Sequence, residues 1–154
     1  MTSSDALGDA ARSDLDALLA SALRLAQQEL GQAATFEPFV LVIGHDGRML
    51  SAEVDRSALE KHPGSEEIAQ AATAQLAGLA SSGPVPGVRA TALTLTTRLA
   101  RERSDAVEVR LDHADGTSLL VLLPYKRPKF GGRTEYGEAK TFRGAHEVWP
   151  RPLS

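Results

Sequence analysis

Residues 105–127 read DAVEVRLDHADGTSLLVLLPYKR, and they predict a β-hairpin on which the rest of the chain is layered. Apolar and polar side chains alternate from Val107 to Leu111, which is the two-residue period of a strand. Residues 113–116 predict the turn, because a glycine adopts the positive φ that tight hairpin turns need. Residues 119–123 are apolar throughout, as expected for a central strand that is covered on both faces.

Two amphipathic helices are expected before this hairpin. The first begins at Ser13, whose hydroxyl can cap a helix, and apolar side chains follow at three- and four-residue spacing until Gly31 ends it. The second covers residues 65–79, after the Pro63-Gly64 break, and its apolar face is rich in alanine. A face of small side chains is typical of a helix that lies close to a sheet.

The remaining segments predict further strands of the same sheet. Residues 40–54 form a second hairpin that turns at His45-Asp46-Gly47, and residues 89–99 alternate as a strand with one solvent-exposed face. Residues 134–142 are expected to form an edge strand. The order α-β-β-α-β-β-β predicts an α+β fold with a single antiparallel sheet of about five strands and both main helices on one face.

The composition is that of one globular domain. The chain has 154 residues, of which 42% are hydrophobic and 24% charged. We expect a flexible lead-in over residues 1–12, a single domain over residues 13–142 and an extended tail over residues 143–154. The absence of cysteine excludes disulfides, thiolate metal sites and a cysteine nucleophile. No signal peptide is visible and the longest apolar run, residues 119–123, is too short to cross a membrane, so a cytoplasmic protein with no membrane partner is expected.

The charge is divided unevenly along the chain. Residues 1–124 carry 10 Lys and Arg against 17 Asp and Glu, whereas residues 125–154 carry 7 against 3. Such a division indicates either an anionic partner for the basic part or simple neutralisation of an acidic body by its own tail. Nucleic acid is not an expected partner, because the isoelectric point is about 5.8 and no long basic face is present.

Motifs for catalysis and for cofactors are not found. There is no Gly-x-Ser-x-Gly sequence, and residues 131–133 (Gly-Gly-Arg) lack the preceding strand and following helix of a phosphate-binding loop. We therefore expect no cofactor and favour a protein that is not an enzyme. His45 and His113 both lie in tight turns, where histidine is common. They are a remote metal site only if the two hairpin turns share one end of the sheet.

One cluster of residues is a tentative binding site. A buried strand ends at Pro124, and the loop that follows brings tyrosines and cations together in the sequence. An anionic ligand can be held by Arg and Lys and stacked on tyrosine rings. The alternative is a solvated strand end whose charges prevent edge aggregation. The residues concerned are Tyr125, Lys126, Arg127, Lys129, Arg133 and Tyr136.

Four segments carry a resemblance to known proteins: Phe36-Glu37-Pro38-Phe39, the His45-Asp46-Gly47 turn, the hairpin that ends at Pro124-Tyr125, and Glu135-Tyr136-Gly137-Glu138. Together they resemble a group of small bacterial proteins usually filed as hypothetical, over about residues 14–142. The resemblance implies a bacterial, single-domain protein and no particular activity. The element order is also similar to that of profilin-like and roadblock-like modules, a likeness of fold that implies no function.

The function predicted from these observations is that of a non-enzymatic interaction module, either a homodimer or an adaptor for another protein. A binder of a small anionic ligand, or a weak enzyme, that uses the Tyr125–Tyr136 region is the main alternative. A third is an acidic inhibitor-type protein that recognises a basic partner.

Overall fold

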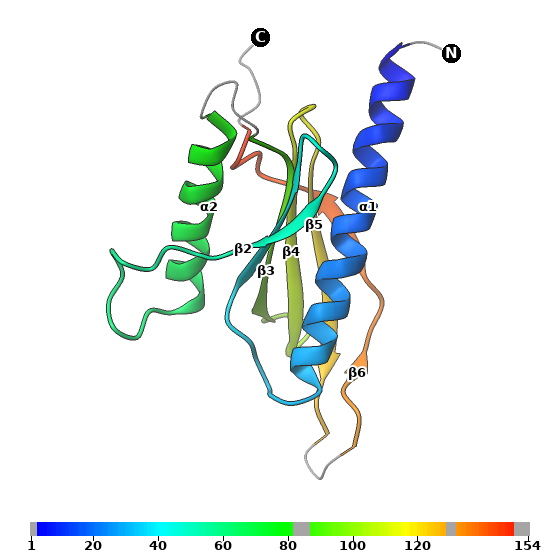
Figure 1. Cartoon of the computed structure of the whole chain (residues 1–154). Coiled ribbons are helices and arrows are strands. Elements are labelled where there is room, and N and C mark those ends of the chain that lie inside the picture. The colour runs from blue at the N-terminus through cyan, green and yellow to red at the C-terminus, as the bar shows by residue number, and fades with distance from the viewer. Residues whose placement is uncertain (1–2, 82–86, 129–131, 150–154) are drawn as a thin grey trace.

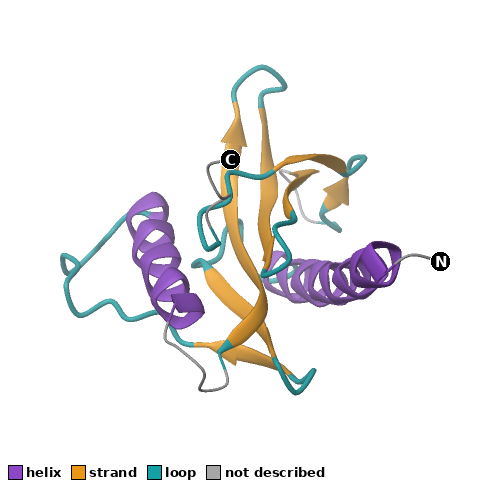
Figure 2. Cartoon of the chain, turned by 90° about the horizontal axis from the view of Figure 1, so that it is seen from above, coloured by secondary structure: helices purple, strands orange, loops and turns teal. Residues whose placement is uncertain are grey.

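The computed structural model describes residues 3–81, 87–128 and 132–149. In this part of the chain, one antiparallel sheet lies between two helices, which cover its opposite faces (Figures 1 and 2). The α+β class, the antiparallel sheet and the order α-β-β-α-β-β-β are confirmed. The placement of both helices on one face was wrong. Both faces of the first strands are apolar, so each face needs a helix to cover it.

Helix α1 (Ser3–Leu30) starts ten residues before Ser13, where the sequence predicts its beginning. Helix α2 (Ser65–Ser81) begins as predicted, with acidic residues in its first turn. Each helix buries a stripe at three- and four-residue spacing, namely Leu15, Leu18, Ala22, Ala26 and Leu30 in α1, and Ile68, Ala69, Ala72 and Leu76 in α2.

The described residues form seven strands rather than about five. They are β1 (Phe39–Gly44), β2 (Met49–Ala52), β3 (Val88–Leu99), β4 (Ser104–His113), β5 (Ser118–Lys126), β6 (Glu135–Tyr136) and β7 (Lys140–Arg143). The strand order is β2-β1-β3-β4-β5-β6, and β7 also pairs with β5. The predicted edge strand over residues 134–142 is thus two short strands, which pair with different parts of β5.

The two predicted hairpin turns are present. Gly47 has a φ of 84° and Gly116 a φ of 103°, values that are costly for residues with a Cβ atom. In each turn the aspartate directly before the glycine accepts a hydrogen bond from the backbone N–H of the residue directly after the glycine. Asp46 accepts from Arg48, and Asp115 accepts from Thr117.

Strands β1 and β3, and not β5, are buried on both faces. The sequence predicts one exposed face for residues 89–99, yet residues 90–95 are all buried. Small side chains explain this, because Ala90 and Ala92 face α1 while Leu93 and Leu95 face α2. Strand β5 is covered by α1 on one face, and Leu120 and Leu122 on its other face stay partly exposed.

The core is therefore divided into two clusters, one on each side of the sheet. The segment after β7 returns to the α2 side, where Val148 is 5% exposed and Trp149 lies against the same cluster. This segment completes a face that α2 covers only in part.

Candidate functional site

Strand β2 forms one edge of the sheet (Figure 1), and among the described residues it pairs with β1 alone. Its sequence, Met49-Leu50-Ser51-Ala52, contains no charged residue and no proline. Natural sheets usually protect their edges with lysine, proline, a bulge or a covering loop. The β2 edge is short but otherwise carries none of the protecting residues.

The backbone of β2 presents hydrogen-bonding groups to the outside. The Gly44 N–H donates to the Arg48 carbonyl at 3.0 Å, and opposite residues keep the same register along the hairpin. Hydrogen-bonded and non-hydrogen-bonded pairs alternate in an antiparallel ladder. Leu50 and Ala52 therefore direct their N–H and C=O groups toward β1, while Met49 and Ser51 direct theirs away from the sheet.

The side chains of β2 divide between the two faces. Met49 lies opposite Ile43 and packs with the cluster under α1. Leu50 lies opposite Val42, a residue of the cluster under α2, so it shares that face. Leu50 is 61% exposed, the highest value among the large apolar side chains of the described residues.

Two grooves flank the β2 edge, one on each face. The groove on the α1 side has a volume of about 510 Å³ and includes Leu25, Phe36 and Phe39 in its wall. The groove on the α2 side, of about 500 Å³, includes Val54 and Ile68. Both grooves share Ser51, so a strand added to β2 has a groove beside it on either face.

The grooves carry more negative than positive charge. Glu37 lines both of them, Glu29 lines the α1-side groove, and Glu53 lines the α2-side groove. The cation beside them is Arg56, which donates to Glu37 at 2.9 Å. A basic side chain from an added strand is therefore favoured at this edge.

The described residues of the predicted anion site lie on or next to β5 and β6, toward the edge of the sheet opposite β2. The rings of Tyr125 and Tyr136 are brought together, with centroids 6.5 Å apart. Tyr125, however, is only 2% exposed, and its hydroxyl donates to the Ala34 carbonyl at 2.8 Å. Burial, with the charge of Asp105 as the next cause, raises the pKa of Tyr125 to about 12. This tyrosine links the sheet to the segment after α1.

The described cations of the same prediction lie at the end of β5 and just before β6. Lys126, Arg127 and Arg133 are exposed, and Lys129 lies outside the described residues. Thr134, next to Arg133, donates its hydroxyl to the Leu30 carbonyl at 3.1 Å. The grooves described above are lined by other residues, so an anionic ligand at this loop stays a prediction.

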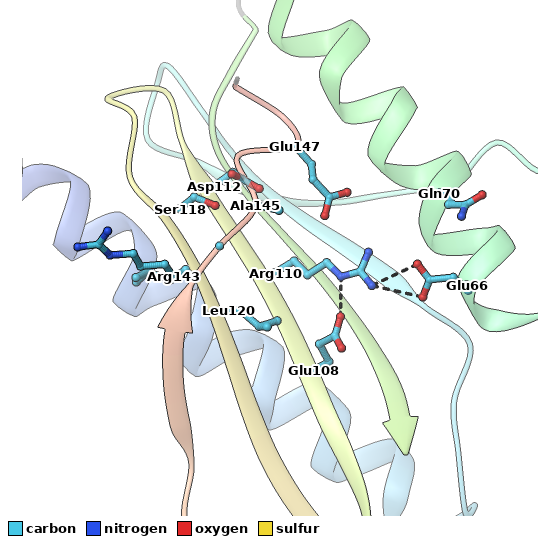
Figure 3. Close-up of a pocket in the computed structure, with 12 residues that line it drawn as sticks. Glu66, Gln70, Glu108, Arg110, Asp112, Ser118, Leu120, Arg143, Ala145 and Glu147 are labelled. Atoms are coloured by element: carbon cyan, nitrogen blue, oxygen red, sulfur yellow. Dashed lines mark hydrogen bonds and ion pairs between the residues drawn. The ribbon is translucent and has the colours of Figure 1, made fainter. Parts of the chain in front are cut away.

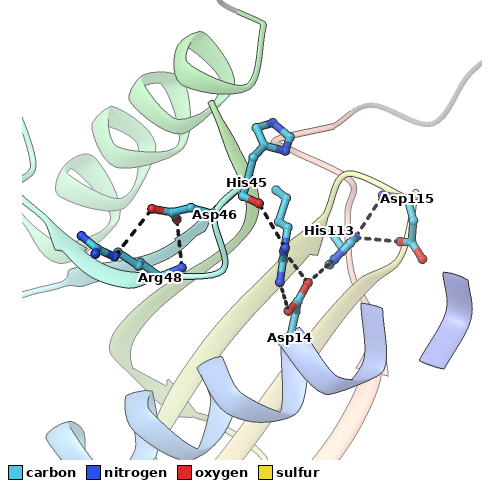
Figure 4. Close-up of polar contacts among 7 residues, drawn as sticks. Asp14, His45, Asp46, Arg48, His113 and Asp115 are labelled. Carbon is cyan, nitrogen blue, oxygen red and sulfur yellow. Dashed lines mark hydrogen bonds and ion pairs between the residues drawn. The ribbon is translucent and has the colours of Figure 1, made fainter. Parts of the chain in front are cut away.

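The two hairpin turns do share one end of the sheet, because Gly44 pairs with Val88 and Ala90 pairs with His113. His45 nevertheless points away from His113 in Figure 4. His113 contacts Asp14 of α1 at 2.8 Å. Among the described residues, no group of three or more His, Asp or Glu side chains is placed to hold a metal ion.

An ion pair that no sequence pattern predicts lies between the two turns (Figure 4). Arg89 donates from Nε and Nη2 to the two carboxylate oxygens of Asp14, each at 2.9 Å, and its Nη1 reaches the His45 carbonyl. Burial opposes ionisation of Asp14, but the hydrogen bonds from Arg89 and His113, together with their charges, lower its pKa. This cluster fixes α1 to the end of the sheet.

The β2 edge was also missed by sequence reasoning. The sequence feature that could have indicated an open edge is the run Met49-Leu50-Ser51-Ala52. It follows a tight turn and contains neither a charged residue nor a proline. Its meaning depends on strand order, because the same four residues in a central strand are ordinary.

Comparison with known proteins gives no match: no family model fits the chain, and no curated protein or solved structure is similar enough to be identified as a relative. The resemblances to small bacterial proteins and to profilin-like modules therefore stay predictions. Within residues 3–81, 87–128 and 132–149, neither helix has the length and apolar character needed to cross a membrane.

Proposed function

We propose that the chain is a non-enzymatic interaction module that forms a homodimer by antiparallel pairing of β2 with β2 of a second copy. The observation that supports this most is the uncharged edge strand, whose Met49 and Ser51 present backbone hydrogen-bonding groups outward. Strand addition at a sheet edge is a common mode of recognition, since main-chain hydrogen bonds provide affinity and flanking grooves provide specificity.

One register satisfies the outward groups on both copies. When Met49 pairs with the partner's Ser51, and Ser51 with the partner's Met49, each pair exchanges two hydrogen bonds. The partner's Leu50 then lies opposite Leu50, at a position where side chains are closest. The exposed leucine of each copy is buried against its equivalent, as an isologous two-fold contact requires.

The same register matches charge and shape in the two grooves. Opposite residues of an antiparallel pair share a face. The partner's Met49 therefore lies at the α1-side groove, near Leu25 and Phe36, and the partner's Arg48 lies opposite Ala52 at the α2-side groove. That groove contains the carboxylates of Glu37 and Glu53, which favour a guanidinium.

The experiment is size-exclusion chromatography with light scattering across micromolar concentrations of wild type, Ser51→Pro and Ser51→Ala. Proline removes the outward N–H of Ser51, which is not used in pairing with β1, whereas alanine keeps it. We expect dimers for wild type and Ser51→Ala, and monomers for Ser51→Pro with an unchanged circular dichroism spectrum.

A monomeric wild type at every concentration contradicts the homodimer, even if the protein binds an extended peptide from another source. A Ser51→Pro variant that remains fully dimeric shows that the dimer uses another surface.

A further inference from the structure

A third groove lies on the α2 side of the sheet, over the part of β4 and β5 that α2 does not cover (Figure 3). Its volume is about 520 Å³. Its walls are formed by α2, the two strands and the segment after β7, from which Glu147 points inward. This groove is separate from the β2 edge, because β1 and β3 lie between them.

Ionisable side chains dominate the lining, with four carboxylates against two guanidinium groups. They are Glu66, Glu108, Asp112 and Glu147, and Arg110 and Arg143. Arg110 is already engaged, because it bonds to Glu108 through Nε and to Glu66 through Nη2 at 3.4 Å. In Figure 3 its guanidinium points toward those two residues and not toward Asp112. The remaining charge of the groove therefore favours a cation.

A small recess of about 10 Å³ adjoins this groove and shares Arg110, Asp112 and Glu147 with it. A recess of that size holds one group as large as a water molecule or an ammonium. Thr91 lines it, opposite Asp112 in the strand register. Thr91 is 1% exposed, and its Oγ1 has no hydrogen-bond partner. Buried hydroxyls are normally bonded, so this hydroxyl is available to a group that enters the recess.

The electrostatics of Asp112 point the same way. Burial raises the pKa of Asp112, and the charge of Glu147 adds to that effect, while the hydrogen bond with Ser118 and the charge of His146 act against it. A carboxyl group in this condition gains from a bound cation more than an exposed one does, because the cation replaces lost solvation.

We propose that the groove binds a primary aliphatic amine, with its ammonium in the recess against Thr91 and Asp112 and its alkyl chain along the groove over Leu120. An ammonium group has three N–H donors, and the recess offers three acceptors in Thr91 Oγ1 and the carboxylates of Asp112 and Glu147. A quaternary ammonium lacks those donors and is larger than the recess. An alcohol of the same length lacks the charge.

The proposal is tested by isothermal titration calorimetry of the full chain at pH 7 and constant ionic strength. The probes are butylamine and 1,4-diaminobutane, with 1-butanol and tetramethylammonium as controls. We expect saturable binding of both amines and none of either control. Since the lost contacts are charge-assisted, Asp112→Asn is expected to weaken amine binding roughly tenfold or more, and Thr91→Val or Glu147→Gln several-fold. Glu102→Gln, which removes an exposed carboxylate from the loop between β3 and β4, is the matched control and leaves amine binding unchanged.

A second readout separates this role from a structural one. Because the pKa of Asp112 is raised in the fold, its ionised form lowers the stability of the free protein at pH 7. Asp112→Asn is thus expected to melt at a higher temperature than wild type while losing the stabilisation that butylamine gives. The proposal is overturned if neither amine binds, if 1-butanol binds as well as butylamine, or if the Asp112 and Thr91 variants bind like wild type. In the first case the recess holds a water molecule.

Discussion

The β2 edge and the β6–β7 edge are the two opposite edges of the same sheet. They differ in how well they are protected against pairing with a further strand. Along β5, two short strands cover different segments, and they carry Glu135, Lys140 and Arg143. Along β1, the covering strand β2 has no charge, and Leu50 projects from it. Charges on an outer strand oppose the approach of another strand. The difference leaves the β2 edge open and the β6–β7 edge closed.

Two exposed apolar residues allow a direct comparison of the edges. Leu50 is 61% exposed on β2 and Phe142 is 48% exposed on β7. Leu50→Lys places like charges opposite each other in the proposed dimer, so its dissociation constant is expected to rise about 100-fold or more. Phe142→Lys is expected to leave the dimer intact. Analytical ultracentrifugation of both variants measures the difference, and an equal effect at the two edges contradicts it.

A substitution at Gly144, directly after β7, is expected to open the β6–β7 edge. A Cβ at Gly144 collides with Ser118 Oγ and lies 2.8 Å from the Leu119 nitrogen, too close for the chain after β7 to keep its place beside β5. Gly144→Ala is therefore expected to lower the free energy of unfolding by about 1–3 kcal/mol and to expose β5 to self-association.

Gly137→Ala is the control, since its Cβ meets Pro124 only at an ordinary distance of 3.4 Å. Urea denaturation and light scattering measure the two effects. A Gly144→Ala protein as stable and as soluble as the Gly137→Ala protein shows that β7 is not what closes this edge.

A substitution that lowers stability far from both edges is expected to leave the oligomeric state unchanged. Asp14→Asn breaks the two-point contact with Arg89 and the contact with His113, and about 1–2 kcal/mol of stability is expected to be lost at pH 7. Because the pKa of Asp14 is lowered in the fold, its contribution is present above the ordinary value of 3.8 and disappears as the pH falls through the folded pKa.

Urea denaturation at pH 7 and at pH 2.5 is expected to show a gap between wild type and Asp14→Asn that shrinks in acid. Asp16→Asn, an exposed neighbour on α1, serves as the control. A gap of constant size at both values of pH shows that the carboxylate charge is not what holds α1 to the sheet.

The smallest effect is expected at Tyr125. Tyr125→Phe removes the hydrogen bond to the Ala34 carbonyl and is expected to cost about 1 kcal/mol, whereas Lys126→Ala with Arg127→Ala leaves stability unchanged. The raised pKa, about 12 against an ordinary 10.0, means that stability falls as the pH rises above 10.0. An absorbance titration of the two tyrosines checks this, and an ordinary pKa for both places Tyr125 outside the core.

Local patterns accounted for much of the fold. The Asp-Gly turns gave the hairpins at Gly47 and Gly116, and the apolar spacing gave the buried stripes of both helices. Those features depend on residues that are neighbours in the sequence, whose periodicity is set by the element itself.

What could not be predicted depends on strand order and on distant pairs. A leucine such as Leu50 has the same sequence environment in a central strand as in an edge strand. Asp14 and Arg89 are 75 residues apart, and neither has a pattern that points to the other. The opposite placement of the helices follows from the two apolar faces of β1, whose four consecutive apolar residues do not show which helix covers which face.

The late position of Val148 in the core has a consequence for synthesis on the ribosome. The cluster under α2 contains residues from β1, α2 and β3, yet its cover is completed only by the segment around Val148 and Trp149. While those residues are still inside the exit tunnel, β5 has neither β7 beside it nor this segment across it. The nascent chain therefore passes through an interval in which both edges are open, and the second edge is closed only after residue 148 has left the tunnel.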